Sequence, residues 1–381
     1  MFFGRQKEVG ALIEQLNTPG QHSLLFGDRG VGKSSLANIA SELLLKRFIA
    51  GELFQKRCDS ADTFVSVVAA PLRAVGIDVS ESGSSRSKAE GGAANIGIPG
   101  LGAKVDSHTT TIRELAGARE LASPSWVAEK LSGLKGLLLI DEVDALTNSR
   151  DRHLLAELVK QLSDRGADLK VLLVGIADTG AHLTAGHPSV NRCLKETRLK
   201  RMSNDELREI IEGGEKRAGL AFSDTAKNRI IKVSSGYAHF THLLALKAAE
   251  DAIAAGKGEI FVSDVVHSTR RAVDDAEGSL KRAYDDATRS HQTDEYRRII
   301  CAAAECGADE FSAGELRAAY KGLWGVEIKQ SALNNYFIRL VAEGDGNILR
   351  RLAKGVYRFN DPRMPSFIKI ANPLTPSKFS D

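Results

Sequence analysis

The first half of the chain alternates short apolar runs with stretches in which apolar residues recur at helical spacing. The apolar runs have the length of buried strands and cover residues 23–26, about 54–58, 136–140 and 170–176. Helical spacing covers residues 8–16, 35–49, about 61–75 and 152–161. This alternation predicts an α/β fold over residues 1–201, with a parallel sheet and helices on both of its faces.

From residue 202 the pattern becomes helical. Ser203 and Glu206 form a capping box that opens a helix to about residue 217. Further helices are expected after Ser223, over about residues 240–255, and from Ser263. The charged stretch 274–292 is expected to be a connector. We therefore predict a small helical lid domain and connector over residues 202–292.

The last part of the chain, residues 293–381, follows a different pattern. Helical spacing covers three short segments, 294–306, 312–320 and 329–342, and two strand-like runs follow at 347–351 and 355–359. Three helices and a basic β-hairpin predict a winged helix-turn-helix, which a basic tail follows.

Residues 79–123 interrupt the first domain and are rich in glycine and serine. Residues 81–88 are expected to be flexible. For residues 93–112 two interpretations remain open: a β-hairpin with an apolar, glycine-rich tip, or a disordered surface loop.

Composition narrows the class of protein. The 381 residues are 43% hydrophobic and 27% charged, which is ordinary for a globular chain of two or three domains, and the net charge is only +3. The four cysteines are scattered, which argues against a zinc site. The first residues resemble no signal peptide, and no apolar run is long enough to span a bilayer. A cytoplasmic protein without membrane contact is expected.

A glycine-rich loop follows the first apolar run and precedes a helix. The pattern G-x-x-x-x-G-K-[ST] is matched from Gly27 to Ser34. Backbone N–H groups of such a loop surround a polyphosphate, Lys33 reaches the β- and γ-phosphates, and the Ser34 hydroxyl binds Mg²⁺. The predicted nucleotide-binding residues are Gly27, Asp28, Arg29, Gly30, Val31, Gly32, Lys33, Ser34 and Ser35.

Two carboxylates end the apolar run 136–140. Asp141 is expected to hold Mg²⁺, directly or through water, opposite Ser34. Glu142 is expected to orient and deprotonate the attacking water. The pattern therefore predicts a protein that binds a nucleoside triphosphate with Mg²⁺ and hydrolyses it; the resemblance described next implies that this nucleotide is ATP.

In this order, the loop, the carboxylates, the helical domain and the winged helix resemble AAA+ ATPases of the origin-recognition and archaeal-initiator type. The signal-transducing STAND ATPases are related to them. The resemblance implies a P-loop NTPase sheet and an assembly of identical subunits with nucleotide at their interfaces.

The resemblance also assigns four further residues. It places Arg5 beside the adenine base and Asp178 in the position of a polar sensor. Arg192 would be an arginine finger for a neighbouring subunit, and His239 would replace the usual lid arginine that contacts phosphate. Surface charges without a role are the alternatives for Arg5 and Arg192. A histidine at the lid position predicts slow turnover.

Basic residues gather in the predicted winged helix and after it. The third helix offers six polar residues, of which those towards its N-terminus are expected to contact bases: Lys329, Gln330, Ser331, Asn334, Asn335 and Arg339. The expected phosphate-contacting residues of the hairpin are Arg350, Arg351, Lys354 and Arg358. Further along, Arg363, Lys369 and Lys378 add to this excess of basic residues. The sequence thus predicts an ATPase whose nucleotide state controls assembly on double-stranded DNA. Two alternatives remain: a STAND-like switch that controls a partner protein in defence or signalling, and a regulator of the transposition type.

Overall fold

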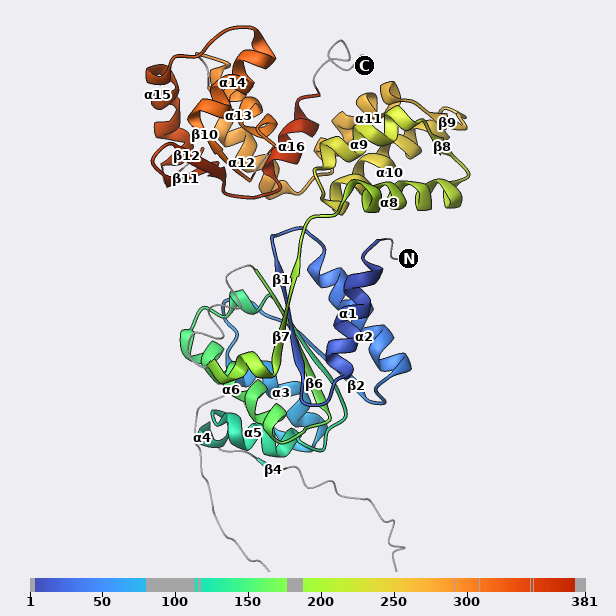
Figure 1. The fold of residues 1–381 in the computed structure, drawn as a ribbon, viewed down its shortest axis with the longest axis vertical. Helices are drawn as coiled ribbons and strands as arrows, with labels where there is room; N and C mark the ends of the chain where they lie inside the picture. The colour runs from blue at the N-terminus through green and yellow to red at the C-terminus, as the bar shows by residue number, and fades with distance from the viewer. Residues whose placement is uncertain are drawn as a thin grey trace, which may run out of the picture. The chain divides into compact units, whose positions relative to one another are not determined.

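The computed structural model describes residues 4–79, 114–115, 118–176, 188–290, 292–307, 309–342, 344 and 346–373. The chain divides into two compact units (Figure 1). The first unit comprises residues 1–8, 27–36 and 199–381, and the second comprises residues 9–26 and 37–198. Asp178, the segment 81–88 that was expected to be flexible and the whole segment 93–112 lie outside the described residues.

A five-stranded sheet forms the centre of the second unit, in the order β2-β5-β6-β1-β7 (Figure 1). The strands are β1 (His22–Gly27), β2 (Glu52–Arg57), β5 (Gly136–Asp141), β6 (Leu169–Gly175) and β7 (Leu194–Leu199). β2, β5, β6 and β1 pair in parallel, and every residue of β5 and β6 is buried. The predicted α/β fold is confirmed.

Helices cover both faces of this sheet, with α1 and α2 on one face and α3, α5 and α6 on the other (Figure 1). Their bounds are α1 (Gln6–Asn17), α2 (Lys33–Arg47), α3 (Phe64–Ala74), α5 (Pro124–Leu131) and α6 (Ser149–Asp164). Smaller elements are β3 (Ile77–Asp78), β4 (Glu114–Leu115), α4 (Ala118–Leu121) and the 3₁₀ helices η1 (Val143–Ala145) and η2 (Pro188–Arg192). Apolar side chains of α3, α5 and α6 pack with those of β5 and β6 into one core.

The strand β7 was not predicted from the sequence. It lies at the edge of the sheet, and four of its six residues are not buried. A strand with one exposed edge accepts charged side chains, so its sequence LKETRL lacks the apolar run by which the other strands were found.

The helical part of the first unit contains α8 (Asn204–Ala218), α9 (Asp224–Ser234), α10 (Ala238–Ala254), α11 (Val262–Asp274) and α12 (Gly278–Thr288), with a short parallel pair β8 (Ala221–Phe222) and β9 (Glu259–Ile260). The predicted capping box is present, because Ser203 and Glu206 bond reciprocally. The prediction of a connector is wrong for residues 278–288. There α12 buries Leu280 and Ala287, which are seven residues apart and so share one helix face.

The last part of the first unit contains three helices and a three-stranded antiparallel sheet. The elements are α13 (Glu295–Glu305), β10 (Glu310–Ser312), α14 (Ala313–Trp324), α15 (Gln330–Val341), β11 (Leu349–Ala353), β12 (Val356–Phe359) and α16 (Met364–Ala371). The three predicted helices and the hairpin are all present. The predicted basic tail is wrong over residues 364–371, because α16 there buries Met364, Phe367, Ile368 and Ile370. No helix in the described ranges is long and apolar enough to cross a membrane.

Candidate functional site

The glycine-rich loop connects β1 to α2, which begins at Lys33. Gly30 and Gly32 have φ values of +84° and +94°, a backbone region that side chains with a Cβ rarely adopt. Val31 between them is buried, and Ser34 and Ser35 lie exposed in the first turn of α2. The loop therefore has the glycine-dependent conformation and the helix N-terminus that a phosphate site requires.

Lys33 is bound to the main chain of its own loop. Its Nζ donates hydrogen bonds to the carbonyl oxygens of Gly27, at 3.0 Å, and Asp28, at 2.9 Å. These bonds hold the ammonium group over the loop instead of leaving it extended into solvent. A cation at this place is suited to phosphate oxygens.

Asp141 and Glu142 lie at the carboxyl end of β5. Asp141 is only 8% exposed, and its Oδ1 accepts a hydrogen bond of 2.9 Å from the backbone N–H of Glu142. Glu142 has φ +56° and ψ +43°, a left-handed conformation that costs a residue with a Cβ about 1–2 kcal/mol. Such strain, kept beside a partly buried carboxylate, supports a functional role for this pair.

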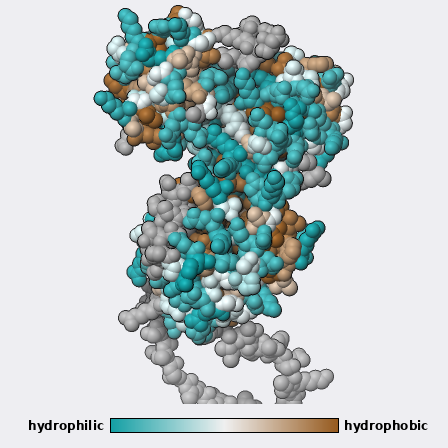
Figure 2. Space-filling model, viewed as in Figure 1, coloured by the Kyte–Doolittle hydropathy of each residue, from teal (hydrophilic) through white to brown (hydrophobic). Residues whose placement is uncertain are grey.

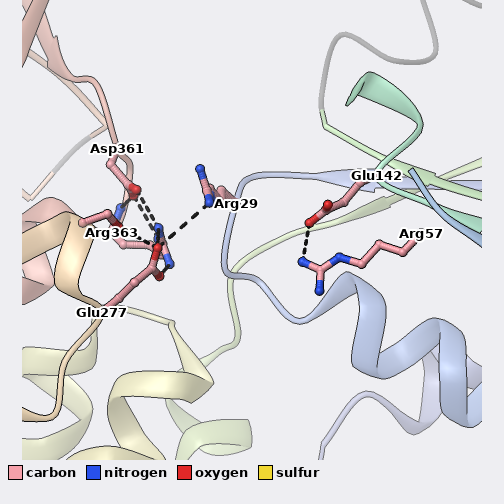
Figure 3. A network of polar contacts seen from close by, with 7 residues as sticks. Arg29, Arg57, Glu142, Glu277, Asp361 and Arg363 are labelled. Atoms are coloured by element: carbon pink, nitrogen blue, oxygen red, sulfur yellow. Dashed lines mark hydrogen bonds and ion pairs between the residues drawn. The ribbon is translucent and has the colours of Figure 1, made fainter. Parts of the chain in front are cut away.

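The side chain of Glu142 is held by an arginine of the neighbouring strand. Arg57 is the last residue of β2, in register with Asp141, and its Nη2 donates to Glu142 Oε1 at 2.7 Å (Figure 3). Both partners are more than two-fifths exposed, so the pair is accessible to water and weak. If Glu142 acts as the base in hydrolysis, the ion pair that it must first break with Arg57 is therefore a weak one.

A second network of charges contacts the glycine-rich loop within the first unit (Figure 3). Glu277 pairs with Arg29 of the loop at 4.0 Å and also accepts hydrogen bonds from Arg363, one of them 3.3 Å long. Arg363 bonds to Asp361 as well, through Nη2 at 2.7 Å and Nε at 3.0 Å. A Cβ added to Gly30 would lie 2.5 Å from Cδ of Arg363, so the arginine stem packs against the loop.

This network changes the chemistry of its carboxylates. The hydrogen bond from Arg363 is the main reason why the pKa of Glu277 falls to about 2. Arg363 itself is only 8% exposed, which is low for an arginine and matches its two carboxylate partners. Sequence reasoning missed this network. Its members lie in three segments more than 80 residues apart along the chain, and no local pattern marks them.

Two residues assigned by family resemblance lie in the same unit. Arg5 is buried, with Nη1 donating to Glu8 at 3.1 Å and Nη2 donating to the Lys200 carbonyl, so it is not a surface charge. His239 lies in the first turn of α10 with its ring 5.4 Å from that of Phe240. Its side chain is exposed by surface area, but the surrounding protein and the Arg363 charge lower its pKa. The neutral imidazole is thereby favoured.

The remaining predicted residues are at the surface. Arg192 ends η2 with an exposed side chain, and its carbonyl accepts a hydrogen bond from Gln21. The predicted DNA-contacting residues that are exposed on α15, just before it or on the hairpin are Lys329, Gln330, Asn334, Asn335, Arg350, Arg351 and Lys354. Arg358 is half-buried.

The structure corrects the excess of basic residues counted after the hairpin. Arg363 is neutralised by two carboxylates, and burial lowers the pKa of Lys369. Arg363 therefore adds nothing to a basic surface beyond the hairpin, and Lys369 is half-buried there.

Known structures resemble the chain only distantly. Cdc6p from Pyrobaculum aerophilum is 16% identical, with a TM-score of 0.49, over 98% of this chain and 95% of the other. The Aeropyrum pernix ORC1 protein in complex with DNA is 16% identical, with a TM-score of 0.49, over 98% and 94%. The Thermotoga maritima RuvB Holliday junction branch migration motor is 16% identical, with a TM-score of 0.46, over 94% and 93%. At these values the likeness carries no argument about function.

Comparison of the sequence with known proteins and protein families identifies the family, which the structural likeness does not. Among curated proteins no sequence matches this chain. A family described as Novel STAND NTPase 1 matches residues 1–250, which include both the glycine-rich loop and the carboxylate strand. This match confirms the predicted relation to STAND ATPases, and the chain belongs to the Novel STAND NTPase 1 family.

Proposed function

We propose that this protein binds ATP with Mg²⁺ at its glycine-rich loop and hydrolyses it slowly. The observation that carries the proposal is the conformation of this loop, with two glycines at positive φ and Lys33 held over the loop carbonyls. The family match adds that nucleoside triphosphates are the substrate class of its members. ATP is the nucleotide that the resemblance to AAA+ proteins favours.

Each catalytic part has a residue of suitable chemistry. Lys33 would bind the phosphates, and the oxygen atoms of Ser34 and Asp141 are hard donors of the kind that Mg²⁺ prefers. The metal ion would neutralise charge on the phosphates. Glu142 would accept a proton from the attacking water once it leaves Arg57. Arg192 would act in a neighbouring subunit of a homo-oligomer.

We further propose that the nucleotide state controls assembly on double-stranded DNA through a winged helix over residues 295–359. In support, α13, α14 and α15 with the sheet β10-β12-β11 have the element order of that module. On the hairpin, Arg350 lies opposite Arg358, and Arg358 in turn lies opposite Glu310 of β10 on its other side. The exposed Arg350, Arg351 and Lys354 would supply positive charge for duplex phosphates.

A second candidate is a switch that controls a partner protein. The family match favours this candidate, because the matching family consists of STAND NTPases, and STAND ATPases act in signal transduction. The contact of Glu277 and Arg363 with the loop is also consistent with a conformational response to nucleotide. The two candidates differ in whether duplex DNA changes ATP turnover.

Two variants test the nucleotide site. Lys33→Ala should abolish binding of a fluorescent ATP analogue, because its cation contacts the phosphates. Glu142→Gln should bind ATP normally and lose turnover by at least about a hundredfold. Lys46→Ala, an exposed lysine at the far end of the same helix, is the matched control and should behave as wild type. Unimpaired hydrolysis in the first two variants would contradict the assignment.

A second measurement separates the two candidates. Phosphate release by the full chain is followed with and without duplex DNA at two salt concentrations. Stimulation that declines with salt supports DNA binding, since phosphate contacts are weakened by salt. Turnover that DNA leaves unchanged would favour the protein-controlled switch.

A further inference from the structure

The outward face of α15 carries amide side chains and one large apolar residue. Gln330, Asn334 and Ile338 are spaced four residues apart and so form one stripe, while Leu333 and Phe337 are buried beneath. Ile338 is 70% exposed, the largest fraction among the exposed large hydrophobic residues of the described chain. Figure 2 shows scattered apolar patches among hydrophilic residues on the surface of the chain. A single exposed isoleucine is normal on a protein surface. Here, however, Ile338 lies in line with the two amides, so a ligand bound along the stripe would contact all three side chains.

The amide pair is ordered by a hydrogen bond within the helix. Gln330 Nε2 donates to Asn334 Oδ1 at 2.9 Å. This bond uses the amino group of Gln330 and the oxygen of Asn334. The Gln330 oxygen can still accept a hydrogen bond from a base, and the Asn334 amino group can still donate one. Adenine presents this complement in the major groove, with N7 as acceptor and N6 as donor. The pair is therefore chemically suited to adenine.

Ile338 suits a different atom of the same base pair. Thymine is the only base with a methyl group in the major groove, and apolar side chains recognise it by contact. Eight residues of helix separate Gln330 from Ile338, about 12 Å, which is the length of three to four base pairs. The stripe therefore spans a short run of bases, with the amides at one end and the apolar contact at the other.

The stripe itself is poorly suited to guanine. Guanine is read most often by arginine or lysine, and the stripe carries neither, although Lys329 lies exposed at the N-cap just before it. Arg339 is committed elsewhere, because its guanidinium lies 4.6 Å from the Tyr296 ring and bonds to the carbonyl of Asp286. The hairpin arginines lie on β11 and β12 and supply charge for phosphates.

We propose that α15 reads A·T base pairs, with Gln330 and Asn334 on adenine and Ile338 against a thymine methyl group. The inference rests on the proposed binding of double-stranded DNA and names the bases that this site selects. It makes Ile338 a specificity-determining residue, which the sequence analysis did not single out.

The test begins with selection by the full chain from short duplexes with a randomised centre. The selected duplex is then synthesised with each thymine replaced in turn by uracil, which removes only the methyl group. Affinity is measured by fluorescence anisotropy for wild type, Ile338→Ala, Asn334→Ala and Leu246→Ala. Leu246 is 55% exposed on α10 and provides the matched control.

The expected result is a loss of about three- to fivefold for uracil at one or two positions with wild type, because one methyl contact is removed. Ile338→Ala should bind the thymine duplex at the level of the uracil duplex and show no difference between them. Asn334→Ala should lose about tenfold and relax selection at an adenine. Leu246→Ala should match wild type.

Three results would overturn the inference. Equal affinity for thymine and uracil at all positions, with duplex binding intact, overturns it and leaves the proposed DNA function standing. Selection of G·C pairs opposite this helix does the same. Absence of any salt-dependent duplex binding overturns the DNA function as well, and then Ile338 belongs to a protein-docking surface.

Discussion

Two groups of arginines in the first unit differ in what surrounds them. Arg363 is buried beside the glycine-rich loop and bonds to two carboxylates, with Arg29 close to one of them. Arg350 and Arg351 are exposed on β11, and Arg350 faces another arginine, Arg358, across the hairpin. The first group is neutralised within the chain, whereas the second lies exposed at the surface, where we propose that it contacts duplex phosphates. Residue type alone therefore does not separate a structural cation from a ligand-binding one.

The largest effect that this comparison predicts is on stability. Arg363→Ala should lower the free energy of unfolding by about 2 kcal/mol, because it leaves two carboxylates without their partner. Arg351→Ala should change it by less than about 0.5 kcal/mol, since that side chain is exposed. Urea unfolding is followed by the fluorescence of Trp324 in a Trp126→Phe background, so that the signal comes from the first unit. Equal effects of the two substitutions would contradict the comparison.

The next largest effect is on duplex binding and concerns the exposed arginines of the hairpin. Replacing both Arg350 and Arg351 by alanine should weaken duplex binding about tenfold at low salt. The slope of log affinity against log salt should fall by about two, one for each lost phosphate contact. Fluorescence anisotropy across a salt series measures both values, with Lys46→Ala as the control. A slope identical to that of wild type would remove this hairpin from the DNA interface.

A smaller effect is expected from pH. The pKa of Glu277 is lowered from 4.5 to about 2, so its contribution to stability is present above pH 4.5 and is lost as pH falls towards 2. Because Glu277 is 38% exposed, solvent screening reduces that contribution to about 1 kcal/mol. Urea unfolding at neutral and acid pH should show a weaker acid dependence for Glu277→Gln. An identical dependence would show that the carboxylate is not coupled to Arg363.

The smallest effect concerns the ion pair of Arg57 with Glu142, which belongs to neither group of arginines. Arg57→Ala should remove this one ion pair of Glu142 and raise ATP turnover by less than about fivefold, since exposed pairs contribute under 1 kcal/mol. Arg57→Lys keeps the charge and should remain near wild type. Turnover is measured as phosphate release at saturating ATP. A rise in turnover that persists in the Glu142→Gln background would show that Glu142 is not the base.

Sequence reasoning succeeded where the pattern was local. The glycine-rich loop and the strand that ends at Asp141 were predicted because each lies in one short segment with a strong apolar or glycine signal. It missed β7 and α12, whose charged residues are tolerated at an exposed edge and on an exposed helix face. Apolar periodicity detects burial, and these elements bury few side chains.

The candidate site was predictable only in part for a related reason. Lys33 and Glu142 could be named from the sequence, but the partner of Glu142 could not, because Arg57 lies 85 residues away from it. The counting of Arg363 among the basic residues after the hairpin was wrong because a count of charges does not register Glu277, 86 residues away.

The sequence by itself determined the nucleotide motifs, the α/β class of the first domain and the order of helices and hairpin towards the end. These depend on residues that are neighbours in the chain, whose spacing sets which face they share. Only the tertiary structure decided which charges are neutralised, as at Arg363, and which remain exposed, as at Arg351. The physical reason is that charge pairing and burial depend on distances in space, which folding sets between segments far apart in the sequence.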